Sequence, residues 1–290
     1  MHKSGAAFLL FLWLQNKNIG GKFVNNYVED YYNNNAENEW NRLTNPYTFI
    51  EFISTMNLIE KYFPSKGDVI DIGSGPGRYS IELLKKGYNV TLFELSNEEL
   101  QLAKSKIECK NLKAEEYICE NALNLDKIES NKYDAILLMG PMYHILNEED
   151  RNKVLRESYR ILREGGIAII AYLNSWGCLK AGVTEFSSVF SDINNVYNYL
   201  DNQQFDPSTS FTNLYMATPP KALKEVSDVG FKVISYAGAE GFLSGIEDKI
   251  VELSKENEII YNNLIKVASE TSEYPQYRDA TEHMHIVVKK

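Results

Sequence analysis

Short apolar runs alternate with helix-like segments along the central part of the chain. Three of these runs lie at 69–72, 90–93 and 133–139, and they are rich in Val, Ile or Leu. Runs of this length and composition favour buried β-strands over helices. Segments with helical spacing follow them, such as 148–162, which begins after a capping Asn147. This alternation predicts an α/β fold built on a mostly parallel sheet.

Four further strands are expected from the same kind of pattern. They lie at 116–119, 167–173, 231–236 and 282–288. A long helix over 244–268 separates the last two strands. Seven strands with helices between them predict a doubly wound sheet that has helices on both faces.

A glycine-rich turn follows the first strand. Its sequence is Asp71-Ile-Gly-Ser-Gly-Pro-Gly77, and such a density of glycines lets the backbone adopt positive φ and approach a bound molecule closely. The turn departs from the dinucleotide fingerprint at Arg78, and the absence of a following Lys-Ser or Lys-Thr excludes a P-loop. The second strand ends at Glu94, where an acid can accept hydrogen bonds from ribose hydroxyl groups. The combination predicts a ribose-bearing ligand without a pyrophosphate.

The turn and Glu94 resemble motif I and the ribose-binding acid of the class I S-adenosylmethionine-dependent methyltransferases. The resemblance spans roughly residues 40–173 and continues more weakly to the C-terminus. It implies a Rossmann-like, seven-stranded sheet with an antiparallel last strand, and S-adenosyl-L-methionine as the cofactor. In that family the glycine turn lies against the methionine and ribose of the cofactor. A nicotinamide-type fold, or a tight turn without a ligand, is the alternative.

The resemblance also implies a set of cofactor contacts at the carboxyl ends of the strands. These residues are Asp71, Gly73, Ser74, Gly75, Gly77, Glu94, Leu95, Asn121, Ala122 and Met139. Asn121 replaces a family acid beside the adenine amino group, and its amide oxygen can still accept that hydrogen bond. An Asn in this place is also typical of an ordinary turn. After Glu94, Ser96 and Glu99 predict a capping box at the start of a helix.

A segment rich in Tyr and Asn and then a helix precede the first strand. The pattern Glu39-Trp-Asn-Arg-Leu43 resembles one in a bacterial small-molecule subfamily, whose N-terminal piece lies over the cofactor cleft. The resemblance implies that Arg42 pairs with the cofactor carboxylate. A solvated Arg42 beside a core Trp40 is the alternative. After Pro46, helical spacing predicts a core-facing side formed by Phe49, Ile50, Phe52, Ile53, Met56 and Ile59.

The fourth strand leads into Gly140-Pro-Met-Tyr-His144. Ligands of open α/β sheets bind beyond the carboxyl ends of the strands, so we expect this loop to lie at the reaction site. It resembles a Gly-Pro-Leu-Tyr-His loop of the same subfamily and differs from the Asn-Pro-Pro-Tyr loop of methyltransferases that modify nucleic-acid amino groups. Tyr143 and His144 are therefore candidate catalytic residues, with His144 as a proton acceptor. A packing or capping role for His144 is the alternative.

Two later segments are expected near the same edge of the sheet. The aromatic stretch 174–217 follows the fifth strand, and a segment this long in a compact domain is usually functional, so it predicts a lid or acceptor pocket. An antiparallel last strand would begin at the ligand end, which makes His283 a further catalytic candidate. His285 should share its face. Two His residues without a third ligand do not make a metal site, so none is expected.

Composition narrows the range of partners and compartments. The 290 residues carry 40 acidic and 30 basic side chains, and this formal net charge of −10 argues against a nucleic acid or an anionic membrane as partner. Cys109, Cys119 and Cys178 lack Cys-x-x-Cys spacing and are interpreted as free thiols of a cytoplasmic protein. The apolar run at 6–14 is too short to span a bilayer and lacks a cleavage site. We expect a poorly ordered leader there, with a surface-associated helix as the alternative.

These observations predict one sheet domain with additions. Its expected parts are a leader (1–22), an N-terminal helical cap (23–63), a cofactor-binding core (64–173), an inserted lid (174–217) and the rest of the sheet (218–290). The predicted function is S-adenosylmethionine-dependent methyl transfer to an unidentified small-molecule acceptor by a monomer or homodimer. A protein or RNA methyltransferase and a cofactor-binding protein without transfer activity are the alternatives.

Overall fold

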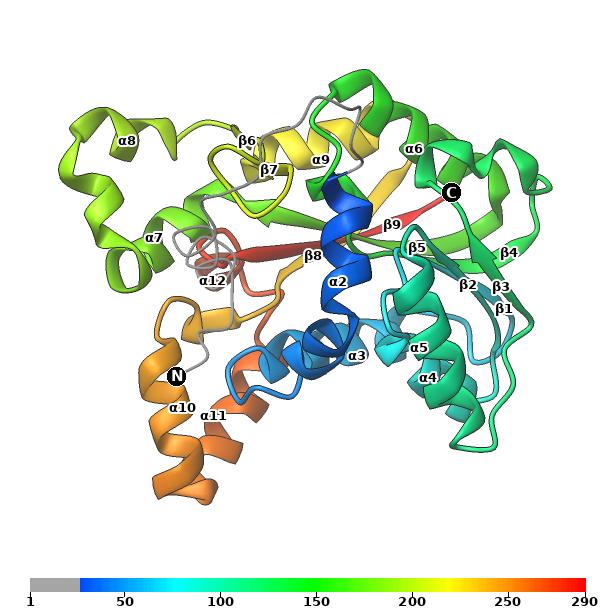
Figure 1. Cartoon of the computed structure of the whole chain (residues 1–290), viewed down its shortest axis with the longest axis horizontal. Helices are drawn as coiled ribbons and strands as arrows, with labels where there is room; N and C mark the ends of the chain where they lie inside the picture. The colour runs from blue at the N-terminus through cyan, green and yellow to red at the C-terminus, as the bar shows by residue number, and fades with distance from the viewer. Residues whose placement is uncertain (1–26) are drawn as a thin grey trace.

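A computed structural model describes residues 27–290. Figure 1 shows a central twisted sheet with helices on both sides. The predicted leader over 1–22, with its apolar run, lies outside the described residues, as do the first residues of the predicted helical cap. Within the described part, no helix combines the length and the apolar character that a bilayer crossing requires.

The described residues form a sheet of nine strands. These strands are β1 (Asp68–Ile72), β2 (Asn89–Glu94), β3 (Glu116–Cys119), β4 (Tyr133–Leu138), β5 (Leu162–Asn174), β6 (Gln203–Phe205), β7 (Leu214–Ala217), β8 (Lys232–Gly238) and β9 (His283–Lys289). The order is β3-β2-β1-β4-β5, with parallel pairing throughout this part. β9 runs antiparallel between β5 and β8, which confirms the predicted fold class and the reversed last strand.

Two additional strands correct the prediction of a seven-stranded sheet. β6 and β7 form an antiparallel hairpin inside the segment 174–217. β7 pairs with β5 at Leu173 and Asn174, whereas the pairing of β5 with β4 ends at Ile170. The hairpin therefore prolongs the sheet beyond the carboxyl end of β4. It was missed because each of its strands is too short for a clear alternation.

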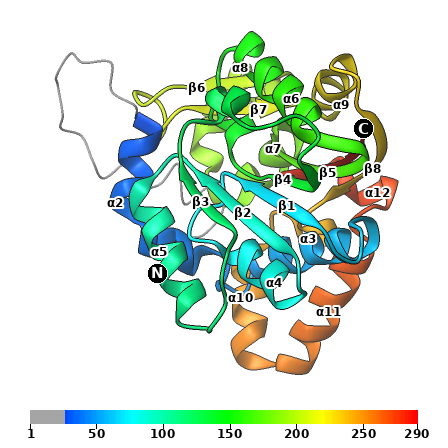
Figure 2. The ribbon, with the colours of Figure 1, turned by 90° about the vertical axis from the view of Figure 1, so that its right-hand side faces the viewer.

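The helices divide between the two faces of the sheet. The α-helices are α2 (Tyr27–Arg42), α3 (Phe49–Tyr62), α4 (Arg78–Lys85), α5 (Asn97–Glu108), α6 (Glu148–Ile161), α7 (Ser175–Glu185), α8 (Ile193–Asn198), α9 (Pro219–Asp228), α10 (Glu247–Glu256), α11 (Glu258–Glu270) and α12 (Pro275–Arg278). Short 3₁₀ turns are η1 (Ala122–Lys127), η2 (Pro141–Tyr143), η3 (Ser187–Ser191) and η4 (Gly241–Leu243). Figure 2 shows α3, α4 and α5 on one face and α6 and α9 on the other.

Each face of the sheet has its own apolar core. Side chains alternate along a strand, so Ile70 and Ile72 pack with α6 and α9, while Val69 packs with α3, α4 and α5. All three side chains are fully buried. Burial on both faces is typical of central parallel strands between two helical layers. It also explains why these strands consist of continuous apolar runs.

Helix boundaries follow the predicted caps in part. Asn147 caps α6, because its Oδ1 accepts the Asp150 N–H at 3.1 Å. The helix predicted over 244–268 is two helices, which corrects that expectation. Asn257 interrupts it with an extended backbone, φ −153° and ψ 89°, and its side chain accepts the Ile260 N–H to begin α11. Asn favours such caps because its side chain competes with the helical backbone for hydrogen bonds.

Helix α2 crosses the edge of the sheet at which β1, β2 and β4 end, and Figure 1 shows it in front of the sheet. At α5, Asn33 Oδ1 accepts the Ser96 hydroxyl at 2.8 Å. At the segment before β7, the rings of Tyr31 and Phe211 meet edge-on with 4.6 Å between centroids. No residue of α2 is fully buried. The helix is therefore attached through side chains along one side.

Candidate active site

The glycine turn between β1 and α4 is tied to the end of β2. The Gly73 N–H donates to the Phe93 carbonyl, and the Gly75 N–H donates to Glu94 Oε2, both at 2.8 Å. Gly75 has φ +52°, which side chains disfavour. A Cβ at Gly75 would meet its nearest atom, Glu99 Oε2, only at 3.7 Å. The turn therefore presents bare backbone to open space where a ligand can approach.

A cavity of about 390 Å³ lies at this edge of the sheet, within the usual size range of small-molecule sites. Twelve of the predicted site residues line it: Arg42, Gly73, Ser74, Gly75, Glu94, Leu95, Asn121, Ala122, Met139, Tyr143, His144 and His283. The fold thus brings together residues from six separate segments of the chain. Their contacts with a cofactor stay a prediction.

Asp71 and Gly77 do not line the cavity, and their contact with the cofactor stays a prediction. Asp71 is fully buried, and its Oδ2 accepts the Ser80 hydroxyl of α4 at 2.6 Å. Burial raises the pKa of Asp71 to about 7. A Cβ at Gly77 would meet the Ala103 Cβ at 3.0 Å, so this glycine allows α5 to pack closely. Both residues support the turn from behind.

Glu94 ends β2 with its carboxylate held by two backbone donors. Oε2 accepts the Gly75 N–H at 2.8 Å, and Oε1 accepts the Ser96 N–H at 2.9 Å. Burial raises the pKa of Glu94, whereas the backbone donors lower it. Glu94 lines the cavity and each carboxylate oxygen has a further lone pair, so the group can accept hydrogen bonds from ribose hydroxyls. The turn and this acid together fit the ribose of a nucleoside.

Asn121 both lines the cavity and caps η1. Its Oδ1 accepts the Leu123 N–H at 2.9 Å, as expected of a turn residue. The oxygen proposed to accept from an adenine amino group is therefore already an acceptor within the chain. One lone pair is left for a ligand.

Arg42 is held by two carboxylates. Its Nη1 lies 2.8 Å from Glu51 Oε2, and its Nε lies 3.3 Å from Glu39 Oε2. Although burial opposes ionisation, Arg42 lowers the pKa of Glu51 to about 2. A fully solvated Arg42 is therefore ruled out. Trp40 does pack against the core, partly buried, with the Arg78 guanidinium 3.9 Å above its ring.

His283 lies at the start of β9, opposite Leu173 of β5. Its Nδ1 is 2.5 Å from Glu240 Oε1. Although burial opposes the charge, the carboxylates of Glu51 and Glu240 raise the pKa of His283 to about 9. A histidine that is already protonated at neutral pH is not suited to be a general base, and the catalytic role of His283 stays a prediction. His285 shares the face, as predicted, and contacts Thr55 Oγ1 at 3.1 Å.

His144 is held at both ring nitrogens. Nδ1 lies 2.9 Å from the Asn213 carbonyl oxygen and must donate to it, so Nε2 accepts the Tyr32 hydroxyl at 2.7 Å. Burial lowers the pKa of His144 to about 4, and the ring is therefore neutral at physiological pH. Tyr143 packs edge-on against it, with 4.9 Å between centroids. The ring is thus fixed in one tautomer beside the cavity.

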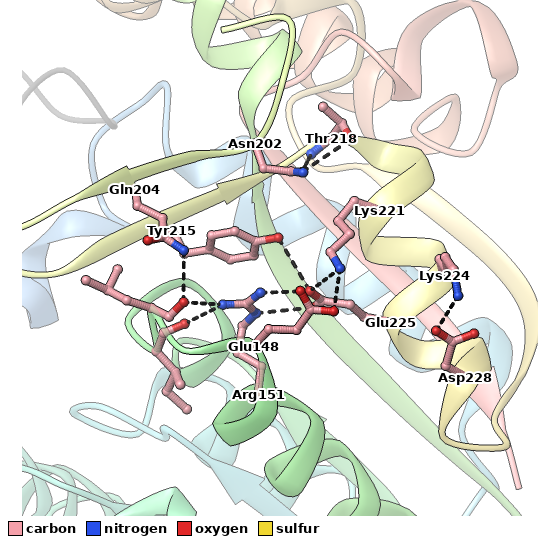
Figure 3. Close-up of polar contacts among 12 residues, drawn as sticks. Glu148, Arg151, Asn202, Gln204, Tyr215, Thr218, Lys221, Lys224, Glu225 and Asp228 are labelled. Carbon is pink, nitrogen blue, oxygen red and sulfur yellow. Dashed lines mark hydrogen bonds and ion pairs between the residues drawn. The ribbon is translucent and has the colours of Figure 1, made fainter. Parts of the chain in front are cut away.

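The loop after β4 is fixed by Arg151, whose polar contacts are drawn in Figure 3 and which does not line the cavity. Its Nη1 donates to the carbonyl oxygens of Ile145 and Leu146 at 2.9 and 2.8 Å. Its Nη2 pairs with Glu225 Oε1 of α9 at 2.8 Å, and its guanidinium lies 3.6 Å over the Tyr215 ring of β7. One buried ion pair therefore joins the loop, the hairpin and α9.

Several polar residues of the cavity wall were not found from the sequence. They are Tyr32, Glu39, Glu51, Glu99 and Asn213. Glu51 lies with Ser54 and Thr55 on the buried side of α3, where the pattern predicted apolar residues. For Glu51, the sequence feature that could have revealed it is the interruption of an apolar helix side by polar residues.

The sheet order, the glycine turn and the acid that ends β2 define an α/β protein of the Rossmann-like class with a nucleoside-type site at its strand ends. Comparison with known proteins narrows this class. Residues 69–166 match the model of a methyltransferase domain. This match confirms the predicted resemblance to the class I S-adenosylmethionine-dependent methyltransferase superfamily. S-adenosylmethionine is the cofactor that defines this superfamily.

Individual relatives are similar over part of their length. A glycine/sarcosine N-methyltransferase from Halorhodospira halochloris is 28% identical over 187 residues, 59% of this chain and 67% of that protein. A ribosomal protein L11 methyltransferase from Staphylococcus carnosus is 34% identical over 118 residues, 38% of this chain and 35% of that protein. Across the glycine N-methyltransferases that it matches, the chain spans from 32% to 67% of their length.

A solved structure shows the same fold over nearly the whole chain. It is the 1,6-didemethyltoxoflavin-N1-methyltransferase of Burkholderia thailandensis, with bound 1,6-didemethyltoxoflavin and S-adenosylhomocysteine. The TM-score is 0.56 at 12% sequence identity, covering 94% of this chain and 93% of that one. At this identity the likeness concerns the fold alone.

Proposed function

We propose that the chain is an S-adenosylmethionine-dependent methyltransferase that acts on a small-molecule acceptor. The observation that carries this proposal is the cavity itself, whose wall contains the glycine turn, Glu94 and the Tyr143–His144 pair. The open backbone at Gly75 and the carboxylate of Glu94 suit the ribose and amino-acid parts of the cofactor. When bound, the cofactor supplies the activated methyl group.

The residues of the chain would mainly align and shield the reactants. Methyl transfer is an in-line displacement at a carbon activated by a sulfonium, so positioning and exclusion of water contribute most. An acceptor that carries a proton also needs a base. The neutral His144 ring could take this proton at Nε2 through Tyr32: the acceptor proton passes to the Tyr32 oxygen as the hydroxyl proton moves to His144.

A small amine is the acceptor class that we propose to test first. The relatives named as glycine/sarcosine N-methyltransferases methylate small amines according to their names. Acidic side chains outnumber basic ones in the cavity wall, which favours a neutral or cationic reactant over an anion. Closure of the cavity by α2 and the β6–β7 hairpin supports a small acceptor rather than a protein or RNA.

Calorimetric titration with S-adenosylmethionine tests the cofactor site. We expect binding in the micromolar range that is lost in Gly75→Val and in Glu94→Ala. Valine at φ +52° is strained and projects into the cavity, and alanine at 94 removes the ribose acceptor. Lys86→Ala, at the exposed end of α4, serves as the control. An unchanged titration in either folded variant rejects the site.

A screen with methyl-labelled cofactor tests the transfer. Glycine, sarcosine and a metabolite extract are incubated with the protein, and labelled products are identified by mass. A labelled small molecule supports the proposal. Label found only in protein or RNA supports a macromolecular acceptor instead, and cofactor binding without any labelled product supports a protein without transfer activity.

We further propose a cytoplasmic location and a monomer or homodimer. Cys109, Cys119 and Cys178 are free thiols, which is typical of a reducing compartment. Light scattering of the purified chain measures the oligomeric state directly.

A further inference from the structure

Glu99 carries a buried carboxyl group with an oxygen that has no partner among the described residues. The residue is only 2% exposed, and its Oε1 takes part in no hydrogen bond. The side chain lies in the wall of the cavity, on the first turn of α5. Burying a carboxyl oxygen without a partner opposes folding, so such a group calls for a functional explanation.

The local structure explains why the helix does not use this carboxyl group. A complete capping box would have Ser96 Oγ accept the Glu99 N–H and the Glu99 carboxylate accept the Ser96 N–H. Only the first bond forms, at 3.1 Å. The Ser96 N–H donates instead to Glu94 Oε1 at 2.9 Å. Because Glu94 accepts this N–H, the Glu99 carboxyl group has no capping role and lies in the cavity wall.

The two carboxyl groups meet at Gly75. The Gly75 N–H donates to Glu94 Oε2, and the Glu99 oxygens lie 3.7 and 4.0 Å from the position of a Cβ at Gly75. Burial and the charge of Glu94 raise the pKa of Glu99 well above its usual range, which favours the neutral form of Glu99 beside the backbone-bound Glu94. A neutral carboxyl group can donate as well as accept a hydrogen bond.

We propose that Glu99 is a second ribose-binding residue, which hydrogen-bonds to one ribose hydroxyl of S-adenosylmethionine beside Glu94. The inference rests on the proposed function, because it concerns the cofactor of that function. A ribose presents two adjacent hydroxyl groups, each a donor and an acceptor. Two adjacent carboxyl groups match such a diol, and binding gives Glu99 Oε1 the partner that it lacks.

Calorimetric titration with S-adenosylhomocysteine and its 2′-deoxy and 3′-deoxy analogues tests this inference. Glu99→Met, which keeps the length of the side chain, is expected to weaken binding of the parent ligand about tenfold. Glu99→Gln should retain most of the affinity, because its amide still forms hydrogen bonds. Glu98→Gln, on the exposed side of the same turn, is the matched control and should bind normally.

The deoxy analogues separate a ribose contact from a general structural effect. With the analogue that lacks the hydroxyl bound by Glu99, Glu99→Met should cause no further loss, while the tenfold loss persists with the other analogue. Glu99→Met should also raise the Tm of the free protein, because it removes an unpartnered buried carboxyl group.

The outcomes distinguish failure of the inference from failure of the proposed function. Unchanged affinity in folded Glu99→Met, or an equal loss with all three ligands, overturns the role of Glu99 and leaves the proposed cofactor site in place. A wild-type chain that binds neither S-adenosylmethionine nor S-adenosylhomocysteine overturns both.

Discussion

At the scale of single residues, His283 is a buried cation that depends on carboxylates from two other elements. Glu51 lies on α3, and Glu240 immediately precedes η4. Although burial opposes the charge, they raise the pKa of His283 to about 9, against about 6.5 in an unfolded chain. The folded state therefore binds more protons between these two values. This contribution to stability is complete below about pH 6.5 and is lost as the pH rises through 9.

His283→Gln is expected to remove this contribution to the pH dependence of unfolding. Urea titrations between about pH 6 and about pH 9 should show wild-type stability falling relative to the variant, by at most about 1.4 kcal/mol per pH unit. His285→Gln is the control, because burial lowers the pKa of His285 to about 4, outside this window. A variant with the wild-type slope would show that His283 is not the titrating group.

The cofactor side of the site could be predicted residue by residue, whereas its polar wall could not. Gly75 belongs to a short motif whose backbone geometry follows from its glycines, and Glu94 ends the apolar strand that comes next in the chain. The role of Glu51 depends on its ion pair with Arg42 of another helix. The role of Glu99 depends on the Ser96 N–H, which donates to Glu94 instead. A sequence pattern contains no information on which of two acids obtains a shared donor. Charge states of buried residues therefore had to come from the fold.

At the scale of elements, Arg151 and Glu225 join the loop after β4 to α9 and the hairpin. Both side chains are almost fully buried, at 2% and 1% exposure. The Tyr172 hydroxyl also donates to Glu225 Oε2 at 3.1 Å, and Gln204 of β6 donates to the Leu146 carbonyl at 3.0 Å. The position of Tyr143 and His144 thus depends on contacts made by residues that follow them in the chain.

Breaking this ion pair is expected to destabilise the fold strongly. Arg151→Met removes the closer ion-pair partner of the buried Glu225 and leaves only Lys221, 3.6 Å from Glu225 Oε1, and loss of a buried partner costs about 3–5 kcal/mol. Chemical denaturation measures the loss. The double variant Arg151→Met/Glu225→Leu should regain much of it, because it removes both charges together. If the double variant is less stable than Arg151→Met by the full effect of a second deletion, the two residues are not coupled.

The elements themselves were predictable where their apolar pattern is long. β1, β2, β4 and α6 match the expected segments closely, because they are buried between two layers, whereas β5 begins five residues before the expected start. The β6–β7 hairpin and the break at Asn257 were missed. The hairpin depends on the pairing of a few residues, and the break depends on one side-chain cap. A hydrophobic pattern averaged over many residues cannot resolve such short features.

At the scale of the whole molecule, the excess of acidic residues opposes binding to nucleic acid. With a formal net charge of −10, the chain lacks the overall positive field that supplies most non-specific affinity for phosphate backbones. We expect no gel shift of transfer RNA at about 150 mM salt under conditions in which S-adenosylhomocysteine binds. A salt-dependent shift would reveal a local basic surface and favour an RNA acceptor.

The length of β5 has a consequence for how reactants come and go. This strand of 13 residues pairs with β4 up to Ile170 and then with β7 at Leu173 and Asn174, while β9 runs beside it as far as Leu173. The β6–β7 hairpin over the cavity is thus part of the central sheet, and moving it away would require breaking its pairing with β5. Helix α2, without a fully buried residue, closes the remaining side. We therefore expect reactants to enter and leave on the side of α2 rather than past the hairpin.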